Sequence, residues 1–249
     1  MSVLLDVRGL EKRFGALVAT DRVDLQVARG EVHALIGPNG AGKTTFVAQL
    51  GGQLEPDRGR IVFDGADITS LAPHERARRG LVRSFQITRL FKSANVLDNI
   101  ALAVQAVSGS SFRAWQPMRA DRKEFERARE VLDDIGLAAK ATHATSQLSH
   151  GERRALEVGM ALASRPLLML LDEPMAGMGS DESARMERLI DVVRATSTVL
   201  LIEHDVDAVF RLADRVSVLV GGRLIASGAP AAVRADAAVI GAYLGDEGG

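Results

Sequence analysis

"GPNGAGKTT", residues 37–45, is the stretch that decides the fold. It follows the apolar run EVHALI and opens a segment of helical pattern, which is the context that the pattern G-x-x-x-x-G-K-[ST] requires. Glycines at this spacing let the backbone turn its N–H groups toward an anion, and the helix N-terminus adds partial positive charge. The stretch predicts a phosphate-binding loop made of Gly37, Pro38, Asn39, Gly40, Ala41, Gly42, Lys43, Thr44 and Thr45.

Three side chains of this loop have predicted roles toward a nucleotide. Lys43 would reach the β- and γ-phosphates, and the Thr44 hydroxyl would ligate Mg²⁺. Thr45 is placed to support the α-phosphate. The alternative is a glycine-rich turn from a strand into a helix with a solvated lysine, which the complete pattern in this context disfavours.

Composition narrows the class of protein. With 249 residues, of which 47% are hydrophobic, the chain can bury one large core or two modest ones. Its 31 Lys and Arg balance 32 Asp and Glu to a formal net charge of -1, which argues against nucleic acid as the main partner, since phosphate-backbone binding needs a concentrated basic face. The chain has no cysteine, which excludes disulfides and thiolate metal sites and fits a cytoplasmic protein.

Neither a targeting segment nor a membrane span is expected. The start, MSVLLDVRGLEKRFG, lacks the basic head, apolar middle and cleavage site of a secretory signal, so the protein should stay where it is made. The longest apolar runs, such as PLLMLL, are far shorter than the roughly 20 residues that cross a bilayer as a helix. Any membrane role must therefore come through a partner.

Short apolar runs alternate with helical patterns along the chain. The runs predict buried strands of a layered α/β core; they are RVDLQV, EVHALIG, LLMLLDE, TVLLIE and RVSVLV. Helical patterns follow Lys43 and cover residues 95–107, 121–135, 152–163, 180–196 and 205–213, with Ser180 and Asp205 as N-caps and Gly136 ending its helix. The interval 86–147 shows no convincing strand, so we interpret it as a helical subdomain inserted into the core.

Two acids end the apolar run in LLMLLDEP, residues 167–174. A strand that ends in Asp172 would deliver a carboxylate beside the phosphate-binding loop, where it can hold the Mg²⁺ shell. Glu173 points elsewhere, since successive strand side chains alternate, and can polarise an attacking water. The alternative, an acid pair that faces solvent, is disfavoured by the complete loop.

Other polar residues gain meaning only beside such a loop. His204 ends the run LLIEHD and could donate to a γ-phosphate, although a lone histidine at a strand end is more often structural. Gln86, in VRSFQITRLF, follows a probable strand and means nothing alone. In LSHGERR, residues 148–154, Ser149 and Glu152 form the pattern of a capping box. The exposed N–H groups of such a helix start can also bind a phosphate.

The whole chain resembles the nucleotide-binding subunit of an ATP-binding cassette (ABC) transporter, on the order and spacing of GPNGAGKTT, Gln86, LSHGE, LLDEP and His204. The resemblance implies an α/β P-loop NTPase fold with a parallel or mixed sheet, an antiparallel β subdomain and an inserted α-helical subdomain. It implies a single ATPase domain over residues 1–249, with the core at about 1–85 and 165–249 and the helical subdomain at about 86–164.

The resemblance also implies the roles of the site residues. ATP and Mg²⁺ would bind, with Phe14 stacked on adenine unless it is only a strand residue, and with Thr44, Gln86 and Asp172 around the metal. Catalysis would fall to Lys43, Gln86, the general base Glu173 and the switch histidine His204.

LSHGE stands where the family has its signature motif. Ser149, His150, Gly151 and Glu152 would act on the ATP of a second cassette, and Ser149 and Gly151 are the two positions that the family uses on the γ-phosphate. His150 replaces a glycine of the family pattern. Gly179 likewise replaces the Asp or Asn that usually ends the next family motif, so this chain lacks the side chain that the family uses there for communication across the dimer.

The finer resemblance is to the cassettes that drive branched-chain amino acid uptake, carried by RSFQITRLFKSANVLDNIALAVQ, LEVGMALASRPLLMLLDEPMAGM and GRLIASGAPAAVRADAAVIGAYLGDEGG. Cassettes for urea or lipopolysaccharide transport share much of this pattern. The implied partners are a second cassette (the same chain or a paralogue), transmembrane permease subunits and a solute-binding protein, with the chain peripheral on the cytoplasmic face of the cell membrane.

Two other classes are alternatives. A soluble cassette protein of DNA repair or translation would carry two cassettes, a coiled coil or basic additions, and a nucleotide-binding metabolic kinase would lack the signature and the switch histidine. The basic run HERARRGLVR, residues 74–83, is interpreted as a solvated helix face rather than a nucleic-acid site.

Overall fold

A mixed sheet forms the centre of the molecule. The computed structural model describes residues 2–84, 90–91, 94–108 and 122–244. The 6-stranded sheet has the order β10-β9-β3-β8-β7-β6, in which β10 is antiparallel to β9 and the other neighbours are parallel. Its strands are β3 (Val32–Ile36), β6 (Leu81–Arg83), β7 (Leu168–Asp172), β8 (Thr198–Ile202), β9 (Arg215–Val220) and β10 (Arg223–Gly228). The predicted α/β fold with a mixed sheet is confirmed.

The register of neighbouring strands sets the place of the site. Leu35 of β3 and Asp172 of β7 both pair with Ile202 of β8, which lies between them. Because these strands are parallel, the loops that follow them leave from one edge of the sheet. The phosphate-binding loop, the acid pair after β7 and the histidine after β8 are therefore gathered at that edge.

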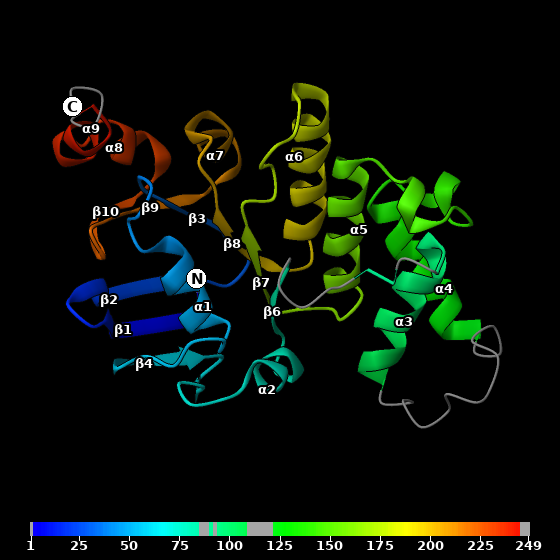
Figure 1. Cartoon of the computed structure of the whole chain (residues 1–249), viewed down its shortest axis with the longest axis horizontal. Coiled ribbons are helices and arrows are strands. Elements are labelled where there is room, and N and C mark those ends of the chain that lie inside the picture. Colours follow the sequence, from blue (N-terminus) through cyan, green and yellow to red (C-terminus); the bar gives the residue numbers. More distant parts are fainter. Residues whose placement is uncertain (1, 85–89, 92–93, 109–121, 245–249) are drawn as a thin grey trace.

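A second sheet, which is antiparallel, covers one face of the first (Figure 1). Its order is β2-β1-β4-β5, with strands β1 (Val3–Phe14), β2 (Leu17–Ala28), β4 (Arg58–Phe63) and β5 (Ala66–Asp67). The sequence pattern identified only residues 22–27 of this sheet. Strand β1 was not predicted from the sequence. Irregularities of its pairing register, one of them between Val7 and Leu10, break the alternation of buried and exposed residues.

Each face of the central sheet has its own hydrophobic core. Successive strand residues point to opposite faces, so Ala34 belongs to one core and Leu35 to the other. The core around Leu35 joins the central sheet to the antiparallel sheet and to helix α1 (Lys43–Leu50). The strand before the phosphate-binding loop and the helix after it are thus both fixed by apolar packing.

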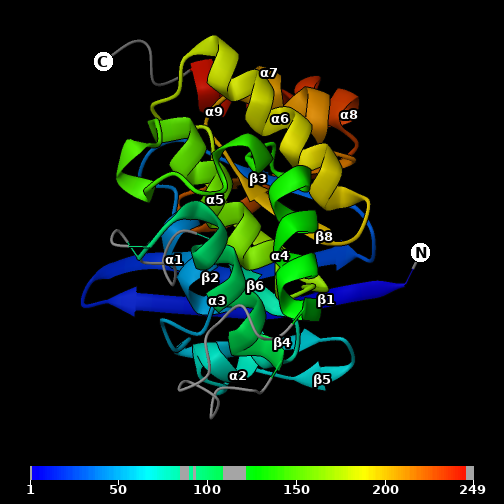
Figure 2. The same cartoon turned by 90° about the vertical axis from the view of Figure 1, so that its right-hand side faces the viewer.

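Apart from the short helix at residues 73–78, which lies beside β6 and the end of α1, the remaining helices pack on the other core or at the far end of the molecule. Figures 1 and 2 show α3, α4 and α5 gathered at the end away from β1 and β2, and α6 to α9 on the face opposite the antiparallel sheet. The helices are α2 (Pro73–Arg78), α3 (Val96–Ser108), α4 (Arg122–Asp134), α5 (His150–Leu162), α6 (Ser180–Arg194), α7 (Val206–Leu212), α8 (Pro230–Arg234) and α9 (Ala237–Leu244). The division into a core and an inserted helical subdomain stays a prediction.

The predicted helix starts are right in one case and wrong in another. Asp205 caps α7, where its carboxylate accepts a hydrogen bond from the Ala208 N–H at 3.0 Å. Ser180 is not a cap, because it is the first helical residue of α6 and Gly179 precedes it as the cap. The backbone at Gly179 is extended, and glycine has no side chain to cap the helix. The N-cap of α6 therefore lies one residue before the position that the sequence pattern indicated.

The interpretation of residues 74–83 as a solvated helix face is wrong for two arginines. Arg76 is only 1% exposed, and its guanidinium donates to the carbonyl oxygens of Gln49 and Leu50 at the end of α1, both at 2.7 Å. Burial lowers the pKa of Arg76 to about 10. Carbonyls at a helix end lack the N–H donors of a following turn; the Gln49 oxygen also accepts from the Gly52 N–H at 3.2 Å, and the buried arginine adds a donor to both carbonyls. Arg83 is buried as well, at the edge of the site.

Candidate functional site

The phosphate-binding loop connects β3 to α1 and is held by close backbone contacts. A Cβ atom on Gly42 would lie 2.1 Å from the Ala19 carbonyl oxygen, and one on Gly37 would lie 2.1 Å from the Leu219 carbonyl oxygen. Gly42 also has a φ of 103°, which strongly favours glycine. The two glycines therefore let the loop pass against the ends of β2 and β9.

Lys43 is folded into this loop rather than solvated. It is 6% exposed, and its ammonium donates to the carbonyl oxygens of Gly37 at 2.6 Å and Pro38 at 3.0 Å. Burial lowers the pKa of Lys43, while the negative charges of Glu173 and Asp172 act in the opposite direction. The lysine thus feels the charges of both acids at the end of β7. Thr44 is exposed and Thr45 is half-buried beside it.

The two acids have different partners. Asp172 is the last residue of β7, whereas Glu173 lies beyond the strand, where the alternation of strand side chains no longer applies. Asp172 forms an ion pair with the Arg83 guanidinium, whose side chain is buried. Glu173 lies with its Oε1 2.5 Å from Nε2 of His204. The Glu173 backbone is left-handed, with φ at 50°, and its N–H donates to the Ile202 carbonyl oxygen at 2.8 Å. The predicted base and the predicted switch histidine are therefore in direct contact.

A buried acid that sequence reasoning missed underlies this contact. Glu203 is 3% exposed and accepts hydrogen bonds from the backbone N–H of Met175 at 2.8 Å and from that of His204 at 3.0 Å. Burial raises the pKa of Glu203. The Glu203 carboxylate thus links the backbone of the turn after Glu173 to the backbone of His204, whose side chain contacts Glu173. The signal was present, since an acid at the end of the apolar run TVLLI is unusual inside a core.

Replacing Glu203 with alanine is expected to destabilise the fold by about 2 kcal/mol, because the buried Met175 N–H and the partly buried His204 N–H lose their acceptor. Urea unfolding of the purified chain measures this loss. Glu203→Gln is the matched variant, since its amide keeps an oxygen for one N–H, and it should lose less. Equal stability of Glu203→Ala and the wild type would contradict the bridging role.

The residues of LSHGE form the start of helix α5. Ser149 caps it, with its Oγ accepting from the Glu152 N–H at 3.2 Å while Glu152 Oε2 accepts from the Ser149 N–H at 3.0 Å. The predicted capping box is confirmed. His150 is exposed at the first helical position. Among the described residues, no hydrogen bond or ion pair joins residues 149–152 to the phosphate-binding loop.

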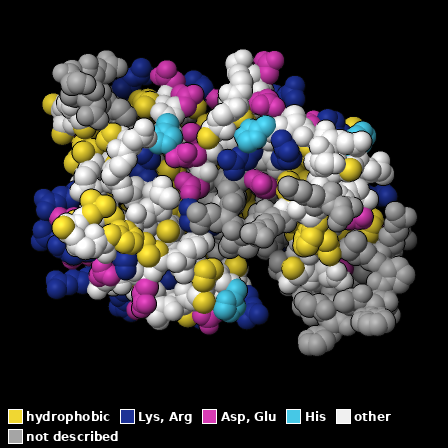
Figure 3. Space-filling view, viewed as in Figure 1, with side chains coloured by type: hydrophobic (Ala, Val, Ile, Leu, Met, Phe, Trp, Pro, Cys, Tyr) yellow, Lys and Arg dark blue, Asp and Glu magenta, His cyan; other side chains and the backbone are white. Residues whose placement is uncertain are grey.

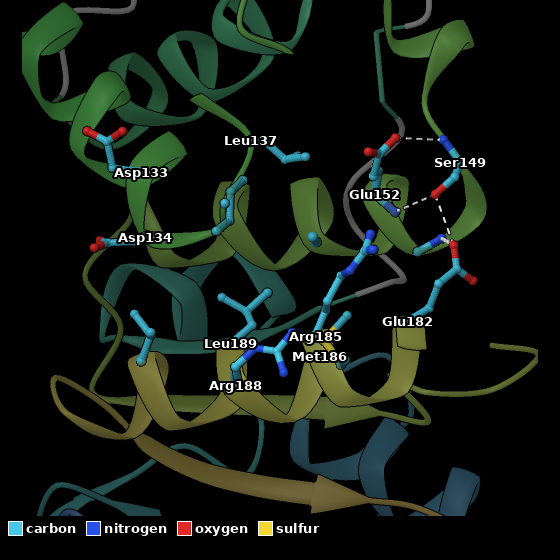
Figure 4. Close-up of a pocket in the computed structure, with 15 residues that line it drawn as sticks. Asp133, Asp134, Leu137, Ser149, Glu152, Glu182, Arg185, Met186, Arg188 and Leu189 are labelled. Atoms are coloured by element: carbon cyan, nitrogen blue, oxygen red, sulfur yellow. Dashed lines mark hydrogen bonds between the residues drawn. The ribbon is translucent and has the colours of Figure 1, made fainter. Parts of the chain in front are cut away.

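Ser149 and Gly151 have a further partner that the sequence did not indicate. Glu182, in the first turn of α6, accepts from the Ser149 hydroxyl at 3.0 Å and from the Gly151 N–H at 3.3 Å (Figure 4). These residues border a cavity of about 370 Å³ between α4, α5 and α6. Residues 37–45 do not line this cavity.

Another predicted residue, Phe14, stands apart from these contacts. Phe14 ends β1 opposite Leu17 and is 50% exposed, with the Lys12 ammonium 5.9 Å from its ring centre. Hydrophobic side chains gather on the surface over β1 and β2 (Figure 3). An exposed aromatic ring is available for stacking. Gln86 lies outside the residues that the structure describes.

A loop of this kind at the carboxyl edge of a mixed sheet, with an antiparallel sheet on one face, places the chain in the class of P-loop ATPases. The family described as ABC transporter matches residues 20–176, and the family described as branched-chain amino acid ATP-binding cassette transporter matches residues 223–249. The chain belongs to the ATP-binding cassette family of ABC transporters.

Similar proteins cover nearly the whole chain. The high-affinity branched-chain amino acid transport ATP-binding proteins BraF of Pseudomonas aeruginosa and LivG of Escherichia coli are each 38% identical to it, with 98% of both chains covered. The lipopolysaccharide export system ATP-binding protein LptB of Acidithiobacillus ferridurans is 36% identical, with 99% of both covered. The ADP conformation of MJ1267, an ATP-binding cassette of an ABC transporter, superimposes with a TM-score of 0.86 at 29% identity and covers 98% of this chain and 100% of its own.

Proposed function

We propose that the chain is the ATP-hydrolysing subunit of a membrane importer for branched-chain amino acids. The observation that carries the catalytic part is the contact of Glu173 with His204 at 2.5 Å, at the sheet edge that also holds the phosphate-binding loop. The identity to BraF and LivG over nearly the whole chain supports the transport part.

The loop and its lysine bind the triphosphate. Lys43 exchanges the carbonyl oxygens of Gly37 and Pro38 for charged phosphate oxygens, which are stronger acceptors. The N–H groups of the loop and the start of α1 face the same phosphates. Phe14, exposed at the end of β1, stacks on the adenine.

Glu173 and His204 act on the attacking water. The Glu173 carboxylate takes a proton from the water as it approaches the γ-phosphorus, and His204 orients this carboxylate. A neutral imidazole has one N–H, so His204 donates to Glu173 in the arrangement seen here and to a phosphate oxygen once it turns toward bound ATP. Gln86 completes the predicted set of groups around the water.

Mg²⁺ fits the donors that the chain presents. No group of three or more His, Cys, Asp or Glu that could hold a metal occurs in the described ranges, and Mg²⁺ needs none, since it is usually bound through one or two carboxylates, substrate phosphates and water. Asp172 and the exposed Thr44 hydroxyl, with Gln86, would hold it. When bound, Mg²⁺ neutralises charge that develops on the phosphoryl oxygens.

The site is completed by a second cassette. Ser149 and Gly151 lie at the start of α5 and make no contact with their own loop among the described residues, which agrees with a role on the partner's ATP. The Ser149 hydroxyl, the Gly151 N–H and the N-terminus of α5 would grip the γ-phosphate of that ATP. His150 and Glu152 flank this contact, Glu152 as part of the capping box.

Membrane attachment comes through partners. Within the described ranges, no helix combines the length and apolar character that a membrane span needs. Transmembrane permease subunits would therefore hold the chain at the cytoplasmic face of the membrane, and a solute-binding protein would deliver the substrate to them.

Deletion of the gene for this chain is expected to abolish high-affinity uptake of radiolabelled leucine, isoleucine and valine. The wild-type chain should restore uptake, whereas Glu173→Gln should not, because transport needs hydrolysis. Urea uptake and the lipopolysaccharide of the outer membrane are the controls. A deletion that leaves leucine uptake intact and impairs either control would assign the chain to one of the related systems.

A further inference from the structure

The start of α5 carries an anion in this structure, and that anion belongs to the chain itself. Glu182 Oε1 accepts from the Ser149 Oγ at 3.0 Å and from the Gly151 N–H at 3.3 Å. Figure 4 shows the Glu182 side chain reaching from the first turn of α6 to the start of α5. The two donors are the same two groups that the proposed function assigns to the γ-phosphate of a second cassette's ATP.

A carboxylate and a phosphate compete for such a place. Both present charged oxygens that accept hydrogen bonds, and both are attracted to the positive end of a helix. A Cβ atom on Gly151 would lie 2.9 Å from both Oε1 and Cδ of Glu182, so the carboxylate lies directly against the helix start. A second anion would meet both an occupied position and a like charge.

Helix α5 does not need Glu182 for its own stability. Its capping box is complete without this residue, since Ser149 Oγ already accepts from the Glu152 N–H and Glu152 from the Ser149 N–H. Glu152 is further held by the Lys140 ammonium at 2.6 Å. The contact of Glu182 with Ser149 and Gly151 is therefore not needed to cap the helix.

Glu182 also has a place to go when it leaves α5. It lies in the first turn of α6 beside Asp181, where the N-terminus of its own helix favours a negative charge. Release therefore does not strand the carboxylate in an unfavourable position. The start of α6 follows Glu173 and Met175 along the chain, so the contact joins the start of α5 to the helix that comes after the catalytic strand end.

We propose that Glu182 is an autoinhibitory latch on the signature motif, which the nucleotide bound to a second cassette must displace before the dimer closes. The proposal rests on the proposed function, because the competing anion is the γ-phosphate of the partner's ATP. Only molecules with an open latch can bind the second cassette. The apparent affinity is therefore the intrinsic affinity multiplied by the fraction of molecules in which the latch is open.

The test measures dimer formation of the Glu173→Gln protein in Mg²⁺ by light scattering as ATP is increased. Adding Glu182→Ala is expected to lower the ATP concentration at half-dimerisation about fivefold or more, and Glu182→Gln should lie between, because a neutral amide oxygen is a weaker acceptor. Affinity for MgATP at protein concentrations too low for dimers should not change, since Glu182 makes no described contact with the phosphate-binding loop.

Asp181→Asn is the matched control. It removes the same charge from the same helical turn, at an exposed position with no described contact to α5. An unchanged or raised midpoint in both Glu182 variants overturns the latch, as does an equal decrease in Asp181→Asn. If the Glu173→Gln parent itself forms no ATP-dependent dimer, the proposed function fails first, and the latch fails with it.

Discussion

Glu173→Gln lowers the ATP turnover of this chain by about a hundredfold or more and traps an ATP-dependent dimer. The loss follows from removal of the general base, whose contribution is typically 10²–10⁴-fold. Glutamine has nearly the same shape, so the contact with His204 at 2.5 Å and the backbone at φ 50° can persist, and nucleotide binding through Lys43 is untouched. Phosphate release measures the turnover, and light scattering with ATP measures the dimer.

Two variants frame this result. His204→Ala removes the partner of Glu173 and should lower turnover, but it leaves the base in place and should trap less dimer. Asp181→Asn changes an exposed acid outside the site and should behave like the wild type. Normal turnover in Glu173→Gln would remove Glu173 from the role of base.

Ser149→Arg leaves nucleotide binding intact and abolishes hydrolysis that depends on the dimer. The long cation fills the place of the partner's γ-phosphate, but it also destroys the cap of α5, at a cost of about 1 kcal/mol. Ser149→Asp separates the two effects. Aspartate is as good a cap as serine, while its charge repels a phosphate. Both variants should be inactive. The arginine variant should lose more stability to urea, because the aspartate variant keeps the cap and loses only the exposed hydrogen bond from Ser149 to Glu182.

Mixing two inactive proteins tests whether the motif works across the dimer. Lys43→Ala has a disabled loop and an intact Ser149, whereas Ser149→Asp has the reverse. In a two-fold dimer with one chain of each kind, one of the two sites is whole, so an equal mixture should regain up to roughly a quarter of the wild-type activity. No recovery above the separate proteins, with an active wild-type control, would show that Ser149 does not serve the neighbouring site.

Much of the fold follows from local sequence. The loop at residues 37–45 requires glycines at fixed positions, and the apolar runs before it and before Asp172 indicate buried parallel strands, so the layered core was predictable. Strand β1 was not, because its bulges break the period of two on which strand prediction depends. The N-cap of α6 was misplaced because Ser180 has a good capping side chain, yet the extended residue before the helix is Gly179.

The candidate site divides in the same way. The candidate site residues at the strand ends could be predicted from the sequence, because acids and a histidine that follow apolar runs can be recognised without knowing the fold. Arg76 and Arg83 could not be recognised as buried, because their run has the composition of a solvated helix. Glu203 was overlooked beside His204, although it is the acid that holds the backbone on both sides of the site.

By itself, the sequence determined that this chain has a phosphate-binding loop between a strand and a helix, an acid pair after a buried strand, and a capped helix start at Ser149. Only the tertiary structure decided which side chains meet. Glu173 bonds a histidine 31 residues away, Ser149 bonds an acid 33 residues away, and Asp172 pairs with an arginine 89 residues away. The physical reason is that local patterns fix periodicity and caps, whereas these contacts depend on the order of parallel strands and on the packing of α5 against α6.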